Sequence, residues 1–467
     1  MVEVVIEGAG PSAAALRAMP GTRTPEGEEF LAELADKSKR LNGCAASAYG
    51  ALYANVDVVT AYPIRPYTAI MMNLAQFIAD GLLDAEYIVA DGEHSQLSIA
   101  LGAGSCGARA FTGSSGVGVT FAYELYSFIS GARIPLQMAI ADRTLDPPGD
   151  FGSEHTDALC TRDMGWLMGW ACTPQEVFDK TLIGYAIGED PRVLLPQMIC
   201  QDGYFVSHIS GEVEMPAKED VDAFLLPYRL PFALDPHRPV SHGAQIHPEQ
   251  GPPLQLERAR AMEAAVPIMR QRTDEFGEIF GRRYAHFVED YMLEDAEIAF
   301  VISGGHAVTC RAAVRRLREQ GIKAGMARLL WIRPFPTEDL QRALAGVGVV
   351  GVVETNLALG GASSGGSLSL DVTTAMYHTP EPRPLITSLN ISNFIGSPPR
   401  NLSPAASCWW RLPKTVPRNP GARGDRPAGP PTVWHPRPKR WSRLRCPGLH
   451  ALVARPEGPL CQAFPAR

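Results

Sequence analysis

Charged side chains that could bind or transform a small anion follow several of the short apolar runs in this 467-residue chain. Arg65 lies in a turn between two prolines, Glu93 follows one apolar run, and Arg143 follows another. Arginine near a helix N-terminus is unfavourable for the helix dipole, so Arg65 could instead be an anion ligand. Structural roles are also open, because Arg65 could be solvated and Glu93 could be a first-turn helix carboxylate. Arg143 could pair with Asp142 or Asp146 and do nothing more.

The elements that must position these residues alternate between strands and helices. Short apolar runs predict strands over residues 56–63, 86–90, 110–112 and 135–141, with helical spacing between them. Such alternation predicts a doubly wound parallel α/β sheet. Ligands of such sheets bind at the carboxyl ends of the strands, where Arg65, Glu93, Ser114, Ser115 and Arg143 stand. A second α/β unit begins near Ala296 and ends in a glycine-rich loop.

Composition and charge narrow the class of protein. The chain is 45% hydrophobic and 20% charged, which is typical of globular proteins. It has no uninterrupted apolar stretch of about 18 residues and no basic segment at its acidic N-terminus, so we expect a cytoplasmic protein without membrane span or secretory signal. Residues 397–467 carry a net charge of +11. Because the whole chain has a net charge of −7, the first 396 residues carry −18. That acidic body argues against nucleic acid as the partner.

The chain divides into five expected regions. They are an N-terminal extension (1–37), an α/β domain (38–225), a connector with a long helix (226–290), a second α/β domain (291–396) and a tail (397–467). The tail holds 15 prolines and 11 arginines without any helical or strand period, so we expect disorder. Its composition is that of an out-of-frame reading of GC-rich DNA, and a basic interaction tail is the alternative.

The nine cysteines contain no C-x-x-C pair. The sequence therefore has neither a zinc-ribbon nor a ferredoxin signature. Scattered cysteines of this kind are expected to be reduced residues of the core. Any iron–sulfur clusters of the system would belong to another chain.

Five motifs, taken together, resemble the alpha subunit of 2-oxoacid:ferredoxin oxidoreductases, a family whose best-known member is pyruvate:ferredoxin oxidoreductase. The motifs are Tyr62-Pro63-Ile64-x-Pro66, Gly92-Glu93-His94-Ser95, Thr112-Gly113-Ser114-Ser115-Gly116-Val117-Gly118, Arg162-Asp163-Met164-Gly165-Trp166 and Val353-Glu354-Thr355-Asn356. The resemblance covers residues 41–392. It implies a pyrimidine-binding domain of the thiamine-diphosphate-binding type at 38–225 and a transketolase-C-terminal-like domain at 291–396.

The resemblance also implies roles for single residues. Glu93 would bond the aminopyrimidine of thiamine diphosphate and favour the tautomer that takes the proton from thiamine C2. Pro63 and Ile64 would contact the cofactor, and Arg143 would bind the substrate carboxylate. The G-D-G…N motif that holds the diphosphate and Mg²⁺ is missing. A beta subunit would supply that half of the site, and iron–sulfur and gamma subunits would carry [4Fe-4S] clusters that reduce ferredoxin. We expect no metal or cluster bound by this chain alone.

One departure from the family pattern concerns the substrate. Threonine usually stands where this chain has Arg65, and a guanidinium offers a charged, bidentate fork for a carboxylate. Arg65 and Arg143 in one dry site would suit a substrate with two carboxylates, and the sequence thus resembles the oxalate oxidoreductase branch, which cleaves oxalate to two CO₂ without coenzyme A. In that hypothesis Asp146 repels the remaining carboxylate of the bound intermediate, and Phe151 swings in to admit the incoming dianion.

Two alternatives remain open at this point. The first is the same class of enzyme acting on pyruvate or another 2-oxoacid and making acyl-coenzyme A. The second is a catalytically inactive subunit that serves assembly only.

Overall fold

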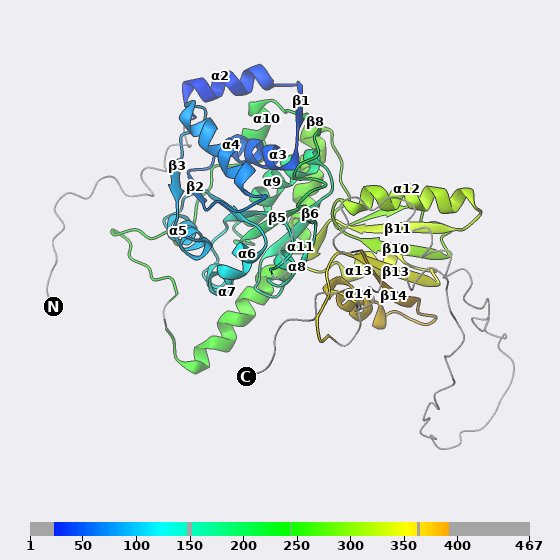
Figure 1. Ribbon diagram of the computed structural model, residues 1–467. Coiled ribbons are helices and arrows are strands. Elements are labelled where there is room, and N and C mark those ends of the chain that lie inside the picture. The colour runs from blue at the N-terminus through cyan, green and yellow to red at the C-terminus, as the bar shows by residue number, and fades with distance from the viewer. Residues whose placement is uncertain (1–22, 147–151, 244, 362–364, 392–467) are drawn as a thin grey trace, which may run out of the picture. The chain divides into compact units, whose positions relative to one another are not determined.

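The computed structural model describes residues 23–146, 152–243, 245–361 and 365–391 (Figure 1). The expected tail at 397–467 lies outside these residues, as do residues 1–22 of the expected N-terminal extension and Phe151. In the described part of the chain, no helix combines the length and the apolar character needed to cross a membrane.

A seven-stranded sheet forms the centre of the first α/β region, and it confirms the predicted doubly wound parallel sheet. Six strands run parallel, and the edge strand next to β6 is antiparallel. In spatial order they are β12 (Trp331–Arg333), β6 (Leu167–Ala171), β7 (Gln197–Asp202), β5 (Gln137–Asp142), β4 (Ala110–Ser114), β2 (Val58–Ala61) and β3 (Glu86–Val89).

Helices cover both faces of this sheet, which is why its central strands are buried along their whole length rather than at alternate residues. Along β5, Ala139 packs into one core cluster, while Met138 and Ile140 pack into the other. Helices α3 (Gly43–Tyr53), α4 (Thr68–Ala79) and α9 (Pro174–Gly188) lie with the first cluster. Helices α5 (Glu93–Ser105), α6 (Val117–Phe121) and α7 (Tyr123–Gly131) lie with the second.

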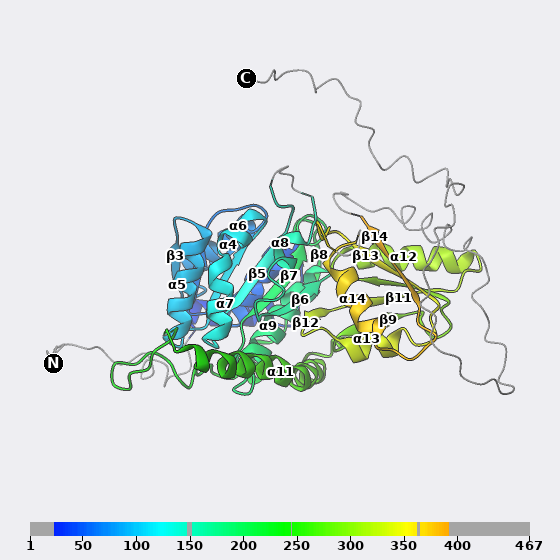
Figure 2. The same ribbon diagram turned by 90° about the horizontal axis from the view of Figure 1, so that it is seen from below.

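The long helix α11 (Gly251–Phe280) lies at the amino ends of the strands. Its Arg258 bonds Ser130, just before β5, and its Arg272 pairs with Asp190, just before β7. Figure 2 shows this helix crossing below the first sheet, opposite the edge at which the strands end. Helix α11 therefore does not cover the carboxyl edge of the first sheet.

The second sheet has five strands, with β9 antiparallel and the rest parallel. Their order is β14 (Leu385–Asn390), β13 (Val349–Glu354), β10 (Ile298–Ile302), β11 (Ala324–Leu329) and β9 (Val288–Tyr291). Its helices are α12 (His306–Glu319), α13 (Thr337–Ala343) and α14 (Ser367–Tyr377). Strand β12 follows β11 in the chain yet pairs with β6 of the first sheet. The smaller elements are α2 (Pro25–Leu34), β1 (Ser38–Leu41), α8 (Thr156–Leu159), β8 (Gly211–Glu214), α10 (Lys218–Phe224) and the 3₁₀ turn Pro248–Gln250.

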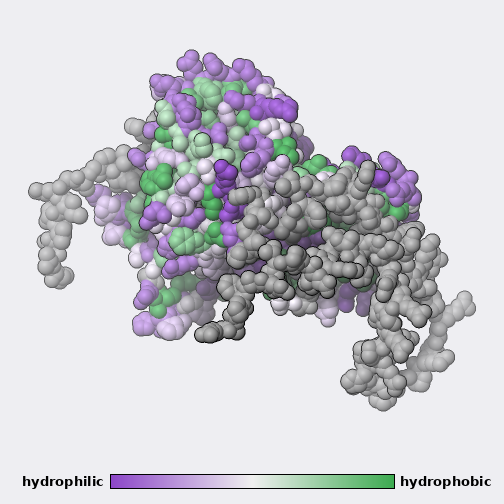
Figure 3. All heavy atoms as spheres, in the orientation of Figure 1, coloured by the Kyte–Doolittle hydropathy of each residue, from purple (hydrophilic) through white to green (hydrophobic). Residues whose placement is uncertain are grey.

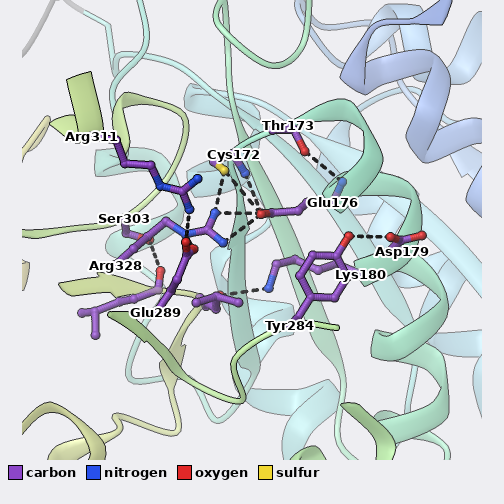
Figure 4. Close-up of polar contacts among 12 residues, drawn as sticks. Cys172, Thr173, Glu176, Asp179, Lys180, Tyr284, Glu289, Ser303, Arg311 and Arg328 are labelled. Atoms are coloured by element: carbon purple, nitrogen blue, oxygen red, sulfur yellow. Dashed lines mark hydrogen bonds and ion pairs between the residues drawn. The ribbon is translucent and has the colours of Figure 1, made fainter. Parts of the chain in front are cut away.

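A buried ion-pair cluster joins the two sheets (Figure 4). Arg328 of β11 binds Glu176 of α9 through two hydrogen bonds of 2.9 and 2.8 Å, and its Nε donates to Glu289 at 2.7 Å. Burial alone would raise the pKa of Glu176, but the charge and hydrogen bonds of Arg328 lower it to about 2. Nearby, Lys180 Nζ donates to the carbonyl oxygen of Leu330 at 3.4 Å. We call Arg328, Glu176 and Glu289 the interdomain clamp.

Candidate active site

Glu93 and Arg143 lie at the carboxyl edge of the first sheet, on neighbouring elements. Glu93 is the first residue of α5 and is 7% exposed. Arg143 directly follows β5 and is 8% exposed. Between them lie Ser114, the last residue of β4, and the following loop with Ser115 and Gly116. The structure thus brings these two predicted site residues together.

Two glycines of the Thr112–Gly118 motif explain why the chain can pass between these charges. A Cβ at Gly118 would lie 2.2 Å from Glu93 Oε1 and 2.5 Å from Ser114 Oγ. A Cβ at Gly116 would lie 2.4 Å from Arg143 Nε, and Gly116 has a φ of +54° that L side chains rarely adopt. The motif therefore lets the backbone approach both charged groups closely.

Burial raises the pKa of Glu93, while its own backbone hydrogen bond and the positive charge of Arg143 act in the opposite direction. Ser114 Oγ is buried beside this carboxyl group and has no hydrogen-bond partner among the described residues. A carboxyl group with a raised pKa beside an unpartnered hydroxyl is typical of a functional site.

Asp157, which the sequence analysis did not select, holds this edge together. Its Oδ2 accepts hydrogen bonds from the backbone N–H groups of Gly116 at 2.7 Å and Arg143 at 3.0 Å. Burial raises the pKa of Asp157 to about 6, against these backbone hydrogen bonds. Burial and the carboxylates of Asp157 and Asp202 raise the pKa of Asp142 well above its usual range. No sequence signal marked Asp157, since it stands on a four-residue helix without a recognisable pattern.

The turn that contains Arg65 lies at the same edge but is more open. The backbone N–H of Tyr67 donates to Ser115 Oγ at 3.3 Å, which ties the turn to the loop after β4. Pro63 and Arg65 are exposed, and Ile64 is half-buried against the core. Among the described residues, Arg65 forms no hydrogen bond or ion pair.

Asp146 is the remaining predicted site residue within the described part of the chain. Its Oδ2 lies 3.4 Å from Arg143 Nη2, and its side chain is 40% exposed. Phe151, its expected counterpart, lies outside the described residues. Arg143 therefore has a carboxylate close by, which a bound substrate carboxylate would have to displace or share.

The motif around Glu354 caps a helix of the second sheet. The Glu354 carboxylate accepts hydrogen bonds from Gly366 N at 2.8 Å and Ser388 Oγ at 2.7 Å, and Asn356 Oδ1 accepts from Ser367 N at 2.7 Å. Gly366 and Ser367 begin α14. A carboxylate at a helix N-terminus satisfies free N–H groups and interacts favourably with the helix dipole. This motif is therefore structural in its contacts.

Thiamine diphosphate fits the carboxyl edge on chemical grounds. An aminopyrimidine needs a buried carboxyl group that can share a proton, and Glu93 with its raised pKa beside Ser114 meets that need. The described residues contain no group of three or more His, Cys, Asp or Glu side chains placed to hold a metal ion.

Comparisons with known proteins agree with this chemistry. Residues 49–274 match the family described as pyruvate flavodoxin/ferredoxin oxidoreductase, thiamine diphosphate-binding, and residues 296–393 match pyruvate:ferredoxin oxidoreductase core domain II. Pyruvate synthase subunit PorA of Methanothermobacter thermautotrophicus is 36% identical over 338 residues, 72% of this chain and 87% of that protein. The chain belongs to the 2-oxoacid:ferredoxin oxidoreductase family.

A second relative and a solved structure extend the comparison. Ketoisovalerate oxidoreductase subunit VorA of Pyrococcus horikoshii is 36% identical over 73% of this chain and 86% of that protein. The 2-oxoglutarate:ferredoxin oxidoreductase of Magnetococcus marinus has the same fold, with a TM-score of 0.61 at 17% identity over 80% of this chain. This chain spans 65% of that solved chain, a little under two thirds. The protein is thus a thiamine-diphosphate-binding alpha subunit of an oxidoreductase of this family.

Proposed function

We propose that this chain supplies the pyrimidine-binding half of an enzyme that oxidises pyruvate or another short 2-oxoacid and makes acyl-coenzyme A. The placement of Glu93 carries the proposal, since its buried carboxyl group lies at the same edge as Arg143. The named relatives, a pyruvate synthase and a ketoisovalerate oxidoreductase subunit, favour a 2-oxoacid over the oxalate that the sequence analysis preferred.

Different residues of this chain would serve proton transfer at the cofactor and binding of the substrate. When bound, thiamine diphosphate supplies the nucleophilic carbon that attacks the 2-oxo carbon of the substrate. Glu93 would hold and return a proton at the aminopyrimidine ring, for which a raised pKa is suited. Arg143 would bind the substrate carboxylate through charge-assisted hydrogen bonds, and its buried position would keep water from competing.

Exposed apolar side chains beside Glu93 support a site shared with a partner. Phe121, whose Cε1 would lie 2.9 Å from a Cβ at Gly92, is 62% exposed, and Val89 at the edge strand β3 is 57% exposed. Figure 3 shows hydrophobic residues at the surface along the side where β3 and α5 lie. A beta subunit docked here would bring the diphosphate and Mg²⁺ ligands, and iron–sulfur subunits would pass electrons to ferredoxin.

The test uses the complex obtained by co-expression of this chain with its beta and iron–sulfur partner subunits. Reduction of a low-potential dye is measured with pyruvate, 2-oxoisovalerate and oxalate, each with and without coenzyme A. We expect coenzyme A-dependent activity on a 2-oxoacid, and a Glu93→Gln variant that assembles normally without that activity. An assembled complex that is inactive on all three substrates would instead support an assembly subunit.

Oxalate is the second candidate, and Arg65 favours it. A guanidinium without a protein partner among the described residues could bind a second carboxylate. Coenzyme A-independent activity on oxalate that is lost in Arg65→Thr would support this candidate. In that case Asp146→Asn should also slow turnover, because the proposed repulsion of the remaining carboxylate would be gone.

A further inference from the structure

Asp202 is a buried carboxylate at one of the contacts between the first sheet and the second sheet. It is the last residue of β7 and is 0% exposed. Its Oδ2 accepts a hydrogen bond from the backbone N–H of Gly305, which precedes α12 of the second sheet. Its Oδ1 accepts from Ser153 Oγ at 2.7 Å and from His155 Nε2 at 3.1 Å. One carboxylate therefore connects α12 to the segment that precedes α8.

Close backbone approach at this contact requires glycine. A Cβ at Gly304 would lie 2.6 Å from Asp202 Oδ2 and 2.8 Å from His155 Cε1, and Gly304 has a φ of +75°. The cavity beside it, lined by residues that include Trp170, His306 and Thr355, offers about 20 Å³ to the centre of a water molecule. That is room for about one water.

The segment from Ser153 to Asp157 has two further links. Asn356, two residues after β13, donates from Nδ2 to Thr156 Oγ1 at 3.4 Å, which is a second contact from the second α/β unit. At the other end of the segment, Asp157 accepts a hydrogen bond from the backbone N–H of Arg143 at 3.0 Å. Asp202 and Asn356 thus link the second sheet to Ser153, His155 and Thr156. The backbone of the segment connects these residues to Asp157, which binds the N–H of Arg143.

We propose that Asp202 is a positioning residue, through which the second sheet sets the place of Arg143 at the carboxyl edge. Asp202 touches no reacting group, and it acts through Ser153, His155 and Asp157. The second sheet thereby controls substrate binding without contributing a side chain to the substrate. This inference rests on the proposed function of Arg143 as the ligand of the substrate carboxylate.

The experiment compares Asp202→Asn with the parental chain in the co-expressed complex. An amide cannot accept from all three donors, so residues 153–159 should exchange their backbone hydrogens faster with solvent. We expect KM for the 2-oxoacid to rise roughly ten- to hundredfold, the scale of one lost set of charge-assisted hydrogen bonds, with affinity for thiamine diphosphate unchanged. The milder variant Thr156→Val should also raise KM and speed the exchange of residues 153–159, but by less than Asp202→Asn.

The control is Glu176→Gln, which loosens the interdomain clamp without touching residues 153–159. It should lower thermal stability and leave KM unchanged. A KM rise in this control as large as in Asp202→Asn would overturn the proposal, as would unchanged exchange of residues 153–159 in both Asp202→Asn and Thr156→Val. Exchange is measured without substrate, so it tests whether Asp202 orders residues 153–159 even if the parental complex proves inactive on 2-oxoacids.

Discussion

Two regions of this molecule bury carboxyl groups, and they treat them in opposite ways. In the interdomain clamp, Glu176 receives two hydrogen bonds from Arg328, and its pKa falls to about 2. At the carboxyl edge, burial raises the pKa of Glu93, and the neighbouring Ser114 hydroxyl has no partner among the described residues. A buried charge that the chain satisfies by itself is structural, whereas one that it leaves open is suited to a ligand.

The largest expected effect follows from Glu93→Gln. An amide cannot take up and return a proton, so turnover of the 2-oxoacid should fall on the order of 10²- to 10⁴-fold. Thermal stability should stay equal or rise, because a poorly solvated carboxyl group is removed. Dye reduction and thermal unfolding check the two parts. His94→Gln, an exposed neighbour that lies 3.3 Å from Glu124, is the matched control and should retain activity.

Glu176→Gln should lower stability and leave turnover unchanged, which is the opposite of the result expected for Glu93→Gln. It leaves Arg328 buried without its main anionic partner, which costs roughly 3–5 kcal/mol of unfolding free energy. Urea unfolding measures this loss, and turnover at a temperature where the chain is folded should be unchanged. Glu212→Gln breaks the exposed pair with Arg40 and should cost about 1 kcal/mol or less. Similar losses of unfolding free energy in Glu176→Gln and Glu212→Gln would contradict the expected difference between the buried clamp and an exposed ion pair.

Arg143→Gln should weaken substrate binding more than it weakens folding. Loss of a charged donor to a carboxylate corresponds to about 1.5–3 kcal/mol, so KM for the 2-oxoacid should rise roughly 10- to 150-fold. Steady-state kinetics of the complex measure the change. An unchanged KM would mean that the substrate carboxylate binds elsewhere.

The smallest effect concerns acid pH. The pKa of Glu176 is lowered to about 2 from its ordinary 4.5, so its contribution to stability is complete above about pH 4.5 and is lost as pH falls toward 2. The stability difference between the parental chain and Glu176→Gln should therefore narrow across this range. Urea unfolding at pH 6, 4 and 3 follows it, and a constant difference would show that Glu176 does not titrate there.

The sequence predicted the parallel sheet because β2, β3, β4 and β5 are short apolar runs ended by turns. It missed α9, since 13 of its 15 residues are buried and no amphipathic period remains. Of the helices predicted between these strands, α4 begins at Thr68, and the helical segment after Gly116 divides at Ala122 into α6 and α7.

At the site, strand ends identified Glu93 and Arg143 as neighbours, because topology alone brings such ends together. No sequence pattern marks Asp157, Ser153 or Asp202, because their roles depend on contacts between segments far apart in the chain. Motif spacing records local backbone needs, such as Gly116 and Gly118, and carries no information on such distant pairs.

Strand β12 has a consequence for how this gene can be divided or recombined. Trp331 of β12 pairs with Gly169 of β6. The first sheet is therefore completed by a strand that comes after β9, β10 and β11 of the second sheet in the sequence. A gene split near residue 290 would leave the outer edge of β6 open, and such an unpaired edge invites aggregation. We therefore expect the two family domains to be inherited and exchanged as one cassette, since neither can be lost without exposing the other.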